Sequence, residues 1–279
     1  MTAGNVTDGF APLTAAEFER VRRLAHRHFG LDLKEGKQAL VEARLSKPLR
    51  RRGFSSYKQY CEHVEADSTG EALAELANAL TTNFTSFMRE PAHFDFLRQV
   101  IVPGLPSRGA VEVWSAACSS GEEPYSILFT LLEAMPAGAD IRVFATDIST
   151  KVLTAAAEGI YTAEATDALP DAWRRRYFLR GNGRYEGKLR VKPEYRDRVE
   201  FRHMNLLSGE LPSRSFPVVF CRNVMIYFDK PTQEAVVRRL SSRLAPGGHL
   251  LIGHSESLAG VAHGLEYVRP ATYRMGRRA

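Results

Sequence analysis

Ser115–Gly121 is a run of small residues that follows a predicted strand and opens a predicted helix. Small residues let a ligand approach the backbone closely, and the amino terminus of a helix favours negatively charged groups. The run lacks the GxGxxG pattern of dinucleotide folds and the GK[ST] pattern of phosphate-binding loops. On spacing alone, an ordinary strand-to-helix turn explains it equally well.

Asp147 ends the next predicted strand. A carboxylate at this place can accept hydrogen bonds from both hydroxyl groups of a nucleoside ribose. Aspartate is also a preferred cap at the start of a helix, and the segment IST that follows would begin one. Both interpretations of Asp147 remain open at this point.

Other patterns of catalytic chemistry are missing from the sequence. Cys61, Cys118 and Cys221 lie far apart and form no CxxC pair, so we expect buried thiols rather than a zinc site or a disulfide framework. The eight histidines include no HExxH, and no metal is expected. The segment GHSES at 253–257 is not the GxSxG nucleophile elbow, which leaves a serine hydrolase with little support.

The elements that must position these residues change in character along the chain. Residues 1–105 are predicted to be helical, with apolar residues at helical spacing. The predicted helix starts are Thr14 with Glu17, Ser55 or Ser56, Ser68 with Glu71, and Pro91. A further helix is expected from Lys37 to Arg52, with a kink or break near Ser46 because Pro48 removes a backbone donor.

A switch to Pro, Gly and Ser around Pro103–Gly109 marks the predicted boundary of a second domain, residues 106–279. The apolar runs that follow are predicted strands at 111–117, 141–147, 199–205, 217–223 and 249–255. Helices are expected near Glu122–Ala134, Thr150–Glu158 and Pro231–Leu244. This alternation favours a parallel, doubly wound sheet that binds its ligand beyond the carboxyl ends of the strands.

One stretch breaks the alternation. Strand-like YFLR and KLRVK flank Gly181, Asn182 and Gly183, which are typical residues of a tight turn. The sequence therefore predicts a small antiparallel insertion at about residues 173–198.

Composition and charge narrow the class of protein. The chain has 279 residues, 44% of them hydrophobic and 25% charged, which is typical of a globular protein and excludes a wholly disordered or collagenous one. Its apolar runs are too short to span a bilayer and no signal peptide is evident, so we expect a cytoplasmic protein without membrane insertion. Arg20–Lys58 carries 12 Lys or Arg against 3 Asp or Glu, a basic surface that suits nucleic acid, a membrane or an acidic protein.

Five segments together carry a family resemblance. They are LTTNFTSFMRE (80–90), VWSAACSSGEEPYSI (113–127), ATDIS (145–149), FCRNVMIYFDKPTQE (220–234) and LAPGGHLLIGHSESL (244–258). In order and spacing they resemble the chemotaxis receptor methyltransferases, the CheR family. The resemblance implies an all-helical amino-terminal domain joined to a Rossmann-like class I methyltransferase domain with an inserted antiparallel β-subdomain.

The resemblance also implies an activity. The enzyme would transfer a methyl group from S-adenosylmethionine to glutamate side chains of chemoreceptors, leaving S-adenosylhomocysteine and glutamyl methyl esters. Arg89 and Tyr227 would lie nearest the transferred methyl group. The implied cofactor contacts are Asn83, Thr85, Arg89, Glu123, Asp147, Asn205, Leu206, Arg222 and Asn223.

The implied partner is the acidic, helical cytoplasmic region of chemoreceptors, with Arg44–Arg52 as the docking surface. A solvated helix face is the alternative for that charge. In some family members the antiparallel subdomain binds a receptor tail peptide as an added strand, and the RGNG loop resembles theirs. Two other functions stay open: a nucleic-acid methyltransferase, although no nucleic-acid recognition module is evident and no nucleic acid is expected, and a scaffold that binds cofactor without turnover.

Overall fold

The computed structural model describes residues 12–106 and 109–276, and the chain divides into two units, Met1–Thr82 and Asn83–Ala279. The division lies well before the boundary predicted at Pro103–Gly109. Phe87, Phe94 and Leu97 are buried in the core of the second unit, and this packing assigns the segment to it. The helical unit is therefore shorter than the predicted 1–105.

The described part of the first unit is helical. Its helices are α1 (Ala15–Phe29), α2 (Gln38–Arg51), α3 (Tyr57–Ala66) and α4 (Glu71–Leu80). The capping box predicted at Thr14 and Glu17 is confirmed, and α1 ends at Gly30 with φ 71°. Ser56 caps α3 by accepting the Gln59 N–H.

Two predictions for these helices were wrong. A kink or break was expected near Ser46, and the break is absent because helix α2 continues through Pro48; both Leu45 and Leu49 are fully buried. Burial of that face outweighs the backbone hydrogen bond that proline cannot make. The second wrong prediction is the capping box at Ser68 and Glu71. Helix α4 begins after Gly70 instead, and the Asp67 carboxylate, 2.7 Å from the Ala72 nitrogen, accepts a first-turn N–H.

The second unit contains a seven-stranded sheet of order β6-β2-β1-β7-β8-β10-β9. Its strands are β1 (Ala110–Ala116), β2 (Asp140–Asp147), β6 (Val199–His203), β7 (Phe216–Cys221), β8 (Leu244–Ile252), β9 (Glu266–Arg269) and β10 (Thr272–Arg274). All five predicted strands are present and parallel. Strands β9 and β10 were not predicted, and because β10 is antiparallel to β8 the sheet is mixed.

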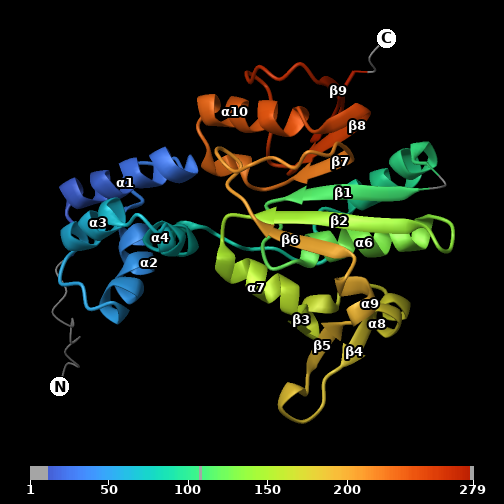
Figure 1. The fold of residues 1–279 in the computed structure, drawn as a ribbon, viewed down its shortest axis with the longest axis horizontal. Helices are drawn as coiled ribbons and strands as arrows, with labels where there is room; N and C mark the ends of the chain where they lie inside the picture. Colours follow the sequence, from blue (N-terminus) through green and yellow to red (C-terminus); the bar gives the residue numbers. More distant parts are fainter. Residues whose placement is uncertain (1–11, 107–108, 277–279) are drawn as a thin grey trace. The chain divides into compact units, whose positions relative to one another are not determined.

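Helices cover both faces of this sheet (Figure 1). Successive residues of a strand point to opposite faces, so Val143 packs in the cluster that contains α6 (Glu122–Ala134), and Phe144 packs in the one that contains α10 (Lys230–Ser241). The other helices that border the sheet are α5 (Pro91–Phe96), continued by a π-helical turn at Leu97–Ile101, and α7 (Thr150–Glu158).

The predicted antiparallel insertion is present and begins earlier than residue 173. Its sheet has the order β3-β5-β4, with β3 at Ile160–Thr162, β4 at Phe178–Arg180 and β5 at Lys188–Val191. Two short helices, α8 (Asp171–Tyr177) and α9 (Pro193–Arg196), flank β4 and β5 in sequence. Strand β3 was missed because it is short and follows the end of α7 directly, whereas the equally short β4 is marked by the turn residues Gly181–Gly183.

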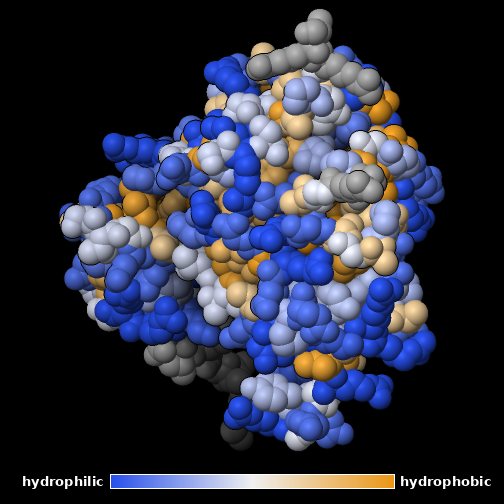
Figure 2. Space-filling model, turned by 45° about the vertical axis from the view of Figure 1, so that its right-hand side comes forward, coloured by the Kyte–Doolittle hydropathy of each residue, from blue (hydrophilic) through white to orange (hydrophobic). Residues whose placement is uncertain are grey.

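The face drawn in Figure 2 is largely hydrophilic, with apolar side chains in small groups. Within residues 12–106 and 109–276, no helix is long and apolar enough to cross a membrane.

Candidate functional site

The carboxyl ends of four neighbouring strands carry most of the predicted site residues. Asp147 ends β2, the loop 117–121 follows β1, Arg222 follows β7, and Asn205 lies two residues beyond β6. These strands are adjacent in the order β6-β2-β1-β7, and their parallel pairing brings their carboxyl ends to one edge. The sequence prediction of a single site at this edge is supported by the topology.

The loop after β1 has an unusual backbone. Ala117, Ser119 and Gly121 all have positive φ angles, and the N–H groups of Ala117 and Cys118 both donate to the Thr146 carbonyl. A Cβ atom at Gly121 would lie 2.8 Å from the Tyr161 hydroxyl oxygen. The loop therefore needs glycine at its last position, and it holds the Ser119 N–H toward β2.

Asp147 receives backbone donors from Ser119, Ser149 and Ile148. Its Oδ2 atom accepts the Ser119 N–H and its Oδ1 atom accepts the Ser149 N–H, each at 2.9 Å. Burial raises the pKa of this carboxyl group, and the Ser149 and Ser119 donors oppose that rise. Ser149, not Asp147, caps helix α7, so the cap interpretation of Asp147 is wrong. A carboxylate offers about four acceptor positions, so three backbone donors leave room for a ligand hydroxyl.

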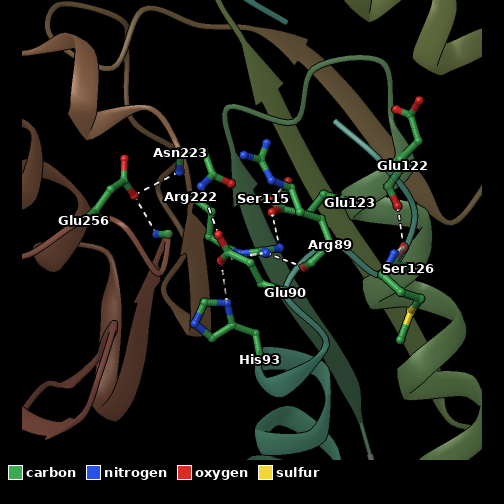
Figure 3. Close-up of polar contacts among 12 residues, drawn as sticks. Arg89, Glu90, His93, Ser115, Glu122, Glu123, Ser126, Arg222, Asn223 and Glu256 are labelled. Carbon is green, nitrogen blue, oxygen red and sulfur yellow. Dashed lines mark hydrogen bonds and ion pairs between the residues drawn. The ribbon is translucent and has the colours of Figure 1, made fainter. Parts of the chain in front are cut away.

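Four buried or half-buried side chains form a network of ion pairs and hydrogen bonds around Arg222 (Figure 3). Arg222 donates to Glu123 Oε2 at 2.9 Å and to Glu90 Oε2 at 3.0 Å. Asn223 Nδ2 donates to Glu90 Oε1 at 3.1 Å, and the Ser115 hydroxyl donates to Glu123 Oε1 at 2.7 Å. Burial raises the pKa of Glu123, and Arg222 opposes this rise. The network ties β1, α6, β7 and the segment before α5 together.

The segment that contains Asn83, Thr85 and Arg89 is anchored to this site. The Asn83 carbonyl accepts the Ser119 hydroxyl at 2.9 Å, and Thr85 is half-buried. The Arg89 guanidinium lies 5.5 Å from the centre of the Phe84 ring and donates to the Phe84 carbonyl at 2.9 Å. Phe84 itself is 74% exposed, whereas Arg89 is half-buried.

The remaining predicted residues lie on the loops after β6 and β7. Asn205 Oδ1 accepts the Leu207 N–H at 2.9 Å, and Leu206 packs partly against the core. Tyr227 is half-buried on the 3₁₀ turn Met225–Tyr227. Among the described residues, no hydrogen bond joins the side chains of Tyr227 and Arg89, so the structure places both in the second unit without linking them directly.

Sequence reasoning missed two acidic residues at this site. Glu90 immediately follows Arg89, and the Glu256 carboxylate accepts the N–H groups of Gly253, Asn223 and Ile226. The sequence feature that could have indicated them is an acidic residue within each motif: Glu90 in LTTNFTSFMRE and Glu256 in GHSES. Neither segment matched a known catalytic pattern, and the backbone donors that use Glu256 cannot be read from side-chain types.

One group of potential metal ligands exists among the described residues. Atoms of Glu90, His93 and His254 lie within 4.8 Å of one another. However, the Arg222 guanidinium is 3.0 Å from the same Glu90 oxygen that lies 3.4 Å from His93 Nδ1. A fixed positive charge on that oxygen disfavours a second cation. We assign no metal here. The three cysteines are free and buried, as predicted.

Comparisons with known proteins cover nearly the whole chain. Residues 16–81 match the family described as CheR methyltransferase, all-alpha domain, and residues 83–273 match CheR methyltransferase, SAM binding domain. The two matches meet at the same place as the two structural units.

Curated relatives agree with the family match. The chain is 42% identical to a chemotaxis protein methyltransferase of Klebsiella aerogenes, covering 94% of this chain and 89% of that protein. It is 40% identical to chemotaxis protein methyltransferase 2 of Pseudomonas aeruginosa, covering 93% of each. A Borreliella burgdorferi chemotaxis protein methyltransferase is 38% identical, with 94% and 95% covered. This chain belongs to the CheR methyltransferase family.

Proposed function

We propose that this enzyme methylates glutamate side-chain carboxylates of chemotaxis receptors, using S-adenosylmethionine as the methyl donor. The observation that carries the proposal is the convergence of Asp147, Glu123 and Arg222 at adjacent strand ends, within a domain that matches the SAM-binding domain of the family. The coarser activity, a methyltransferase acting on chemotaxis proteins, follows from family membership.

The side chains at the strand ends suit the cofactor chemically. Asp147 keeps acceptor capacity for a ribose hydroxyl beside its three backbone donors. Glu123, which accepts from Arg222 and Ser115, places a buried carboxylate at the site. The other residues proposed to hold the cofactor are Asn83, Thr85, Arg89, Asn205, Leu206, Arg222 and Asn223. When bound, S-adenosylmethionine supplies an electrophilic methyl group on a sulfonium centre.

The proposed acceptor needs no general base. A glutamate side chain has a pKa of about 4.3, so it is already ionised at neutral pH. Arg89 would orient this carboxylate rather than neutralise it, because a tight pair would also stabilise the ground state. Tyr227 would donate a hydrogen bond or shape the space around the methyl group. Exclusion of water and alignment of the two groups would then lower the barrier.

The experiment that tests this function uses labelled S-adenosylmethionine and receptor-containing membranes. Base treatment should release the label as methanol, because glutamyl methyl esters hydrolyse in base whereas methylated amines do not. Label that stays bound after base treatment would reject the ester. The scaffold alternative predicts cofactor binding without any transfer.

Two variants test the residues nearest the reaction. Arg89→Ala and Tyr227→Phe should keep the fold but lower the transfer rate by about 10- to 1,000-fold, as for other positioning and hydrogen-bonding groups. Arg98→Ala and Tyr267→Phe are matched controls, since both residues are exposed in the same unit. Full activity of both test variants would reject the two roles.

Two receptor contacts are part of the proposal. The basic helix α2 would meet an acidic helical region of the receptor, and the small sheet would bind a receptor tail peptide along β4, an edge strand of that sheet with Leu179 48% exposed. A pulldown with a tail peptide tests the second contact. No retention of the peptide by the full chain would dismiss it.

A nucleic-acid methyltransferase is the competing enzyme. It predicts binding to DNA or RNA that weakens steeply with salt. The relatives named above are chemotaxis protein methyltransferases, which supports the receptor function instead.

A further inference from the structure

Glu90 follows Arg89 in a strained part of the backbone. Met88 and Glu90 have φ angles of 54° and 57°, in the left-handed region that residues with a Cβ atom rarely adopt. Arg89 therefore lies between two residues in disfavoured conformations. Such a conformation persists only where the surrounding contacts hold it.

The contacts that hold it converge on one carboxylate. Glu90 Oε2 accepts Arg222 Nη2 at 3.0 Å, and Glu90 Oε1 accepts Asn223 Nδ2 at 3.1 Å. The backbone N–H of His254 donates to the same carboxylate. The Arg222 Nη2 group also donates to the Arg89 carbonyl, so one guanidinium binds both Arg89 and Glu90 (Figure 3).

The charge on Glu90 is matched by Arg222 and not by the neighbouring histidine. Burial, together with the charge of Arg222, lowers the pKa of His93 to about 3, so the ring is neutral at physiological pH. Although burial raises the pKa of Glu90, the Asn223 hydrogen bond and Arg222 together bring it down to about 2. Glu90 is therefore an anion, and its two oxygen atoms accept hydrogen bonds from Arg222 and Asn223, the two residues that follow β7.

We propose that Glu90 is a positioning residue that sets the Arg89 backbone relative to Arg222 and Asn223. Glu90 connects the segment that contains Arg89, which is proposed to orient the acceptor carboxylate, to Arg222 and Asn223, which are proposed to contact the cofactor. This inference rests on the proposed role of Arg89 and adds a residue that touches neither the acceptor nor the reacting atoms.

Glu90→Gln is the sharpest change. A glutamine has the same shape but only one acceptor oxygen, so its NH₂ group must face either Arg222 or Asn223, which are both donors. Arg222 would remain paired with Glu123. The variant should therefore lose more in kcat than in the affinity for S-adenosylhomocysteine.

The test is a double-mutant cycle with Arg89→Ala. In single-turnover assays, Glu90→Gln should slow transfer about 10-fold or more in the native background and less than about threefold in the Arg89→Ala background, because residues that act as a unit are not additive. Equal losses in both backgrounds would overturn the proposal. So would a loss confined to cofactor affinity with kcat unchanged.

The control is Glu112→Gln. Glu112 lies near the amino end of β1, and its carboxylate is paired with Arg214. This variant should leave the rate unchanged. If Glu90→Gln fails to fold, Glu90→Asp replaces it: partial activity with the same dependence on Arg89 supports the proposal, and losses that add to those of Arg89→Ala refute it. Full activity of Arg89→Ala alone would instead reject the proposed function of Arg89, which is a different result.

Discussion

The Asp147 carboxylate carries both a structural and a proposed binding role. It holds the N–H groups of Ser119 and Ser149, and these contacts fix the loop beside it. We predict that Asp147→Ala weakens binding of S-adenosylhomocysteine by about 10- to 100-fold, because hydrogen bonds to charged groups contribute about 1.5–3 kcal/mol. Calorimetry measures the change, with Asp140→Ala at the exposed amino end of β2 as control. An unchanged dissociation constant would contradict the ribose assignment.

A second prediction for a single residue concerns pH and Glu90. The pKa of Glu90 is about 2 in the folded chain, below the ordinary value of 4.5. A carboxyl group with a lowered pKa stabilises the fold above its unfolded pKa, and this stabilisation is lost as the pH falls from about 4.5 toward 2.

Wild type should therefore lose more stability than Glu90→Gln between pH 5 and pH 3, by an amount that denaturant unfolding at each pH measures. The raised pKa values of Asp147 and Glu256 act in the opposite direction, but they are common to both proteins and cancel in the difference. The charge of Glu90 itself contributes to the raised pKa of Glu123, so this part of the opposing effect is lost in Glu90→Gln and makes the difference between the two proteins smaller. If the stability of the two proteins changed equally with pH, Arg222 and Asn223 would not lower the pKa of Glu90.

At the scale of elements, the end of β8 controls the residues that follow β7. A Cβ atom on Gly253 would lie 2.4 Å from Asn223 Nδ2 and 2.9 Å from Glu256 Oε2. We predict that Gly253→Ala displaces Asn223, lowers the free energy of unfolding by about 1–3 kcal/mol and weakens cofactor binding.

Gly104→Ala is the matched control, because nothing lies within 4 Å of a Cβ atom at that position and its φ is not positive. Thermal unfolding and calorimetry on the two variants compare them directly. If Gly253→Ala binds cofactor as tightly as Gly104→Ala does, the loop after β8 does not position Asn223.

Long apolar patterns were sufficient to predict the parallel strands and the main helices, whereas short or tertiary features were not. The strands β3 and β10 have three residues each and give no periodicity to read. Pro48 signals a break from local chemistry alone, yet Leu45 and Leu49 keep α2 intact through burial. The site residues could be named from motifs, but the part played by Glu90 depends on Arg222, more than a hundred residues away in the chain.

At the scale of the whole molecule, the proposed receptor-docking surface lies on α2, in the first unit. The structure narrows the proposed docking surface on α2, because Arg44 donates to the Leu80 carbonyl and to Thr82 and so serves the helical unit itself. Lys47 and Arg51 are exposed. These two residues are the better candidates for contact with an acidic receptor region.

Lys47→Glu combined with Arg51→Glu should lower kcat/KM for receptor methylation about 10-fold or more at low salt, because like charges would then oppose docking. The deficit should shrink toward 0.5 M salt, where the Debye length is only about 4 Å. Affinity for S-adenosylhomocysteine should not change, since neither residue lies in the cofactor-binding unit. Arg142→Glu with Arg238→Glu makes the same change in net charge on exposed residues of the second unit and separates local docking from overall charge. If both pairs slow methylation equally, the basic face of α2 is a solvated surface and the receptor is met elsewhere.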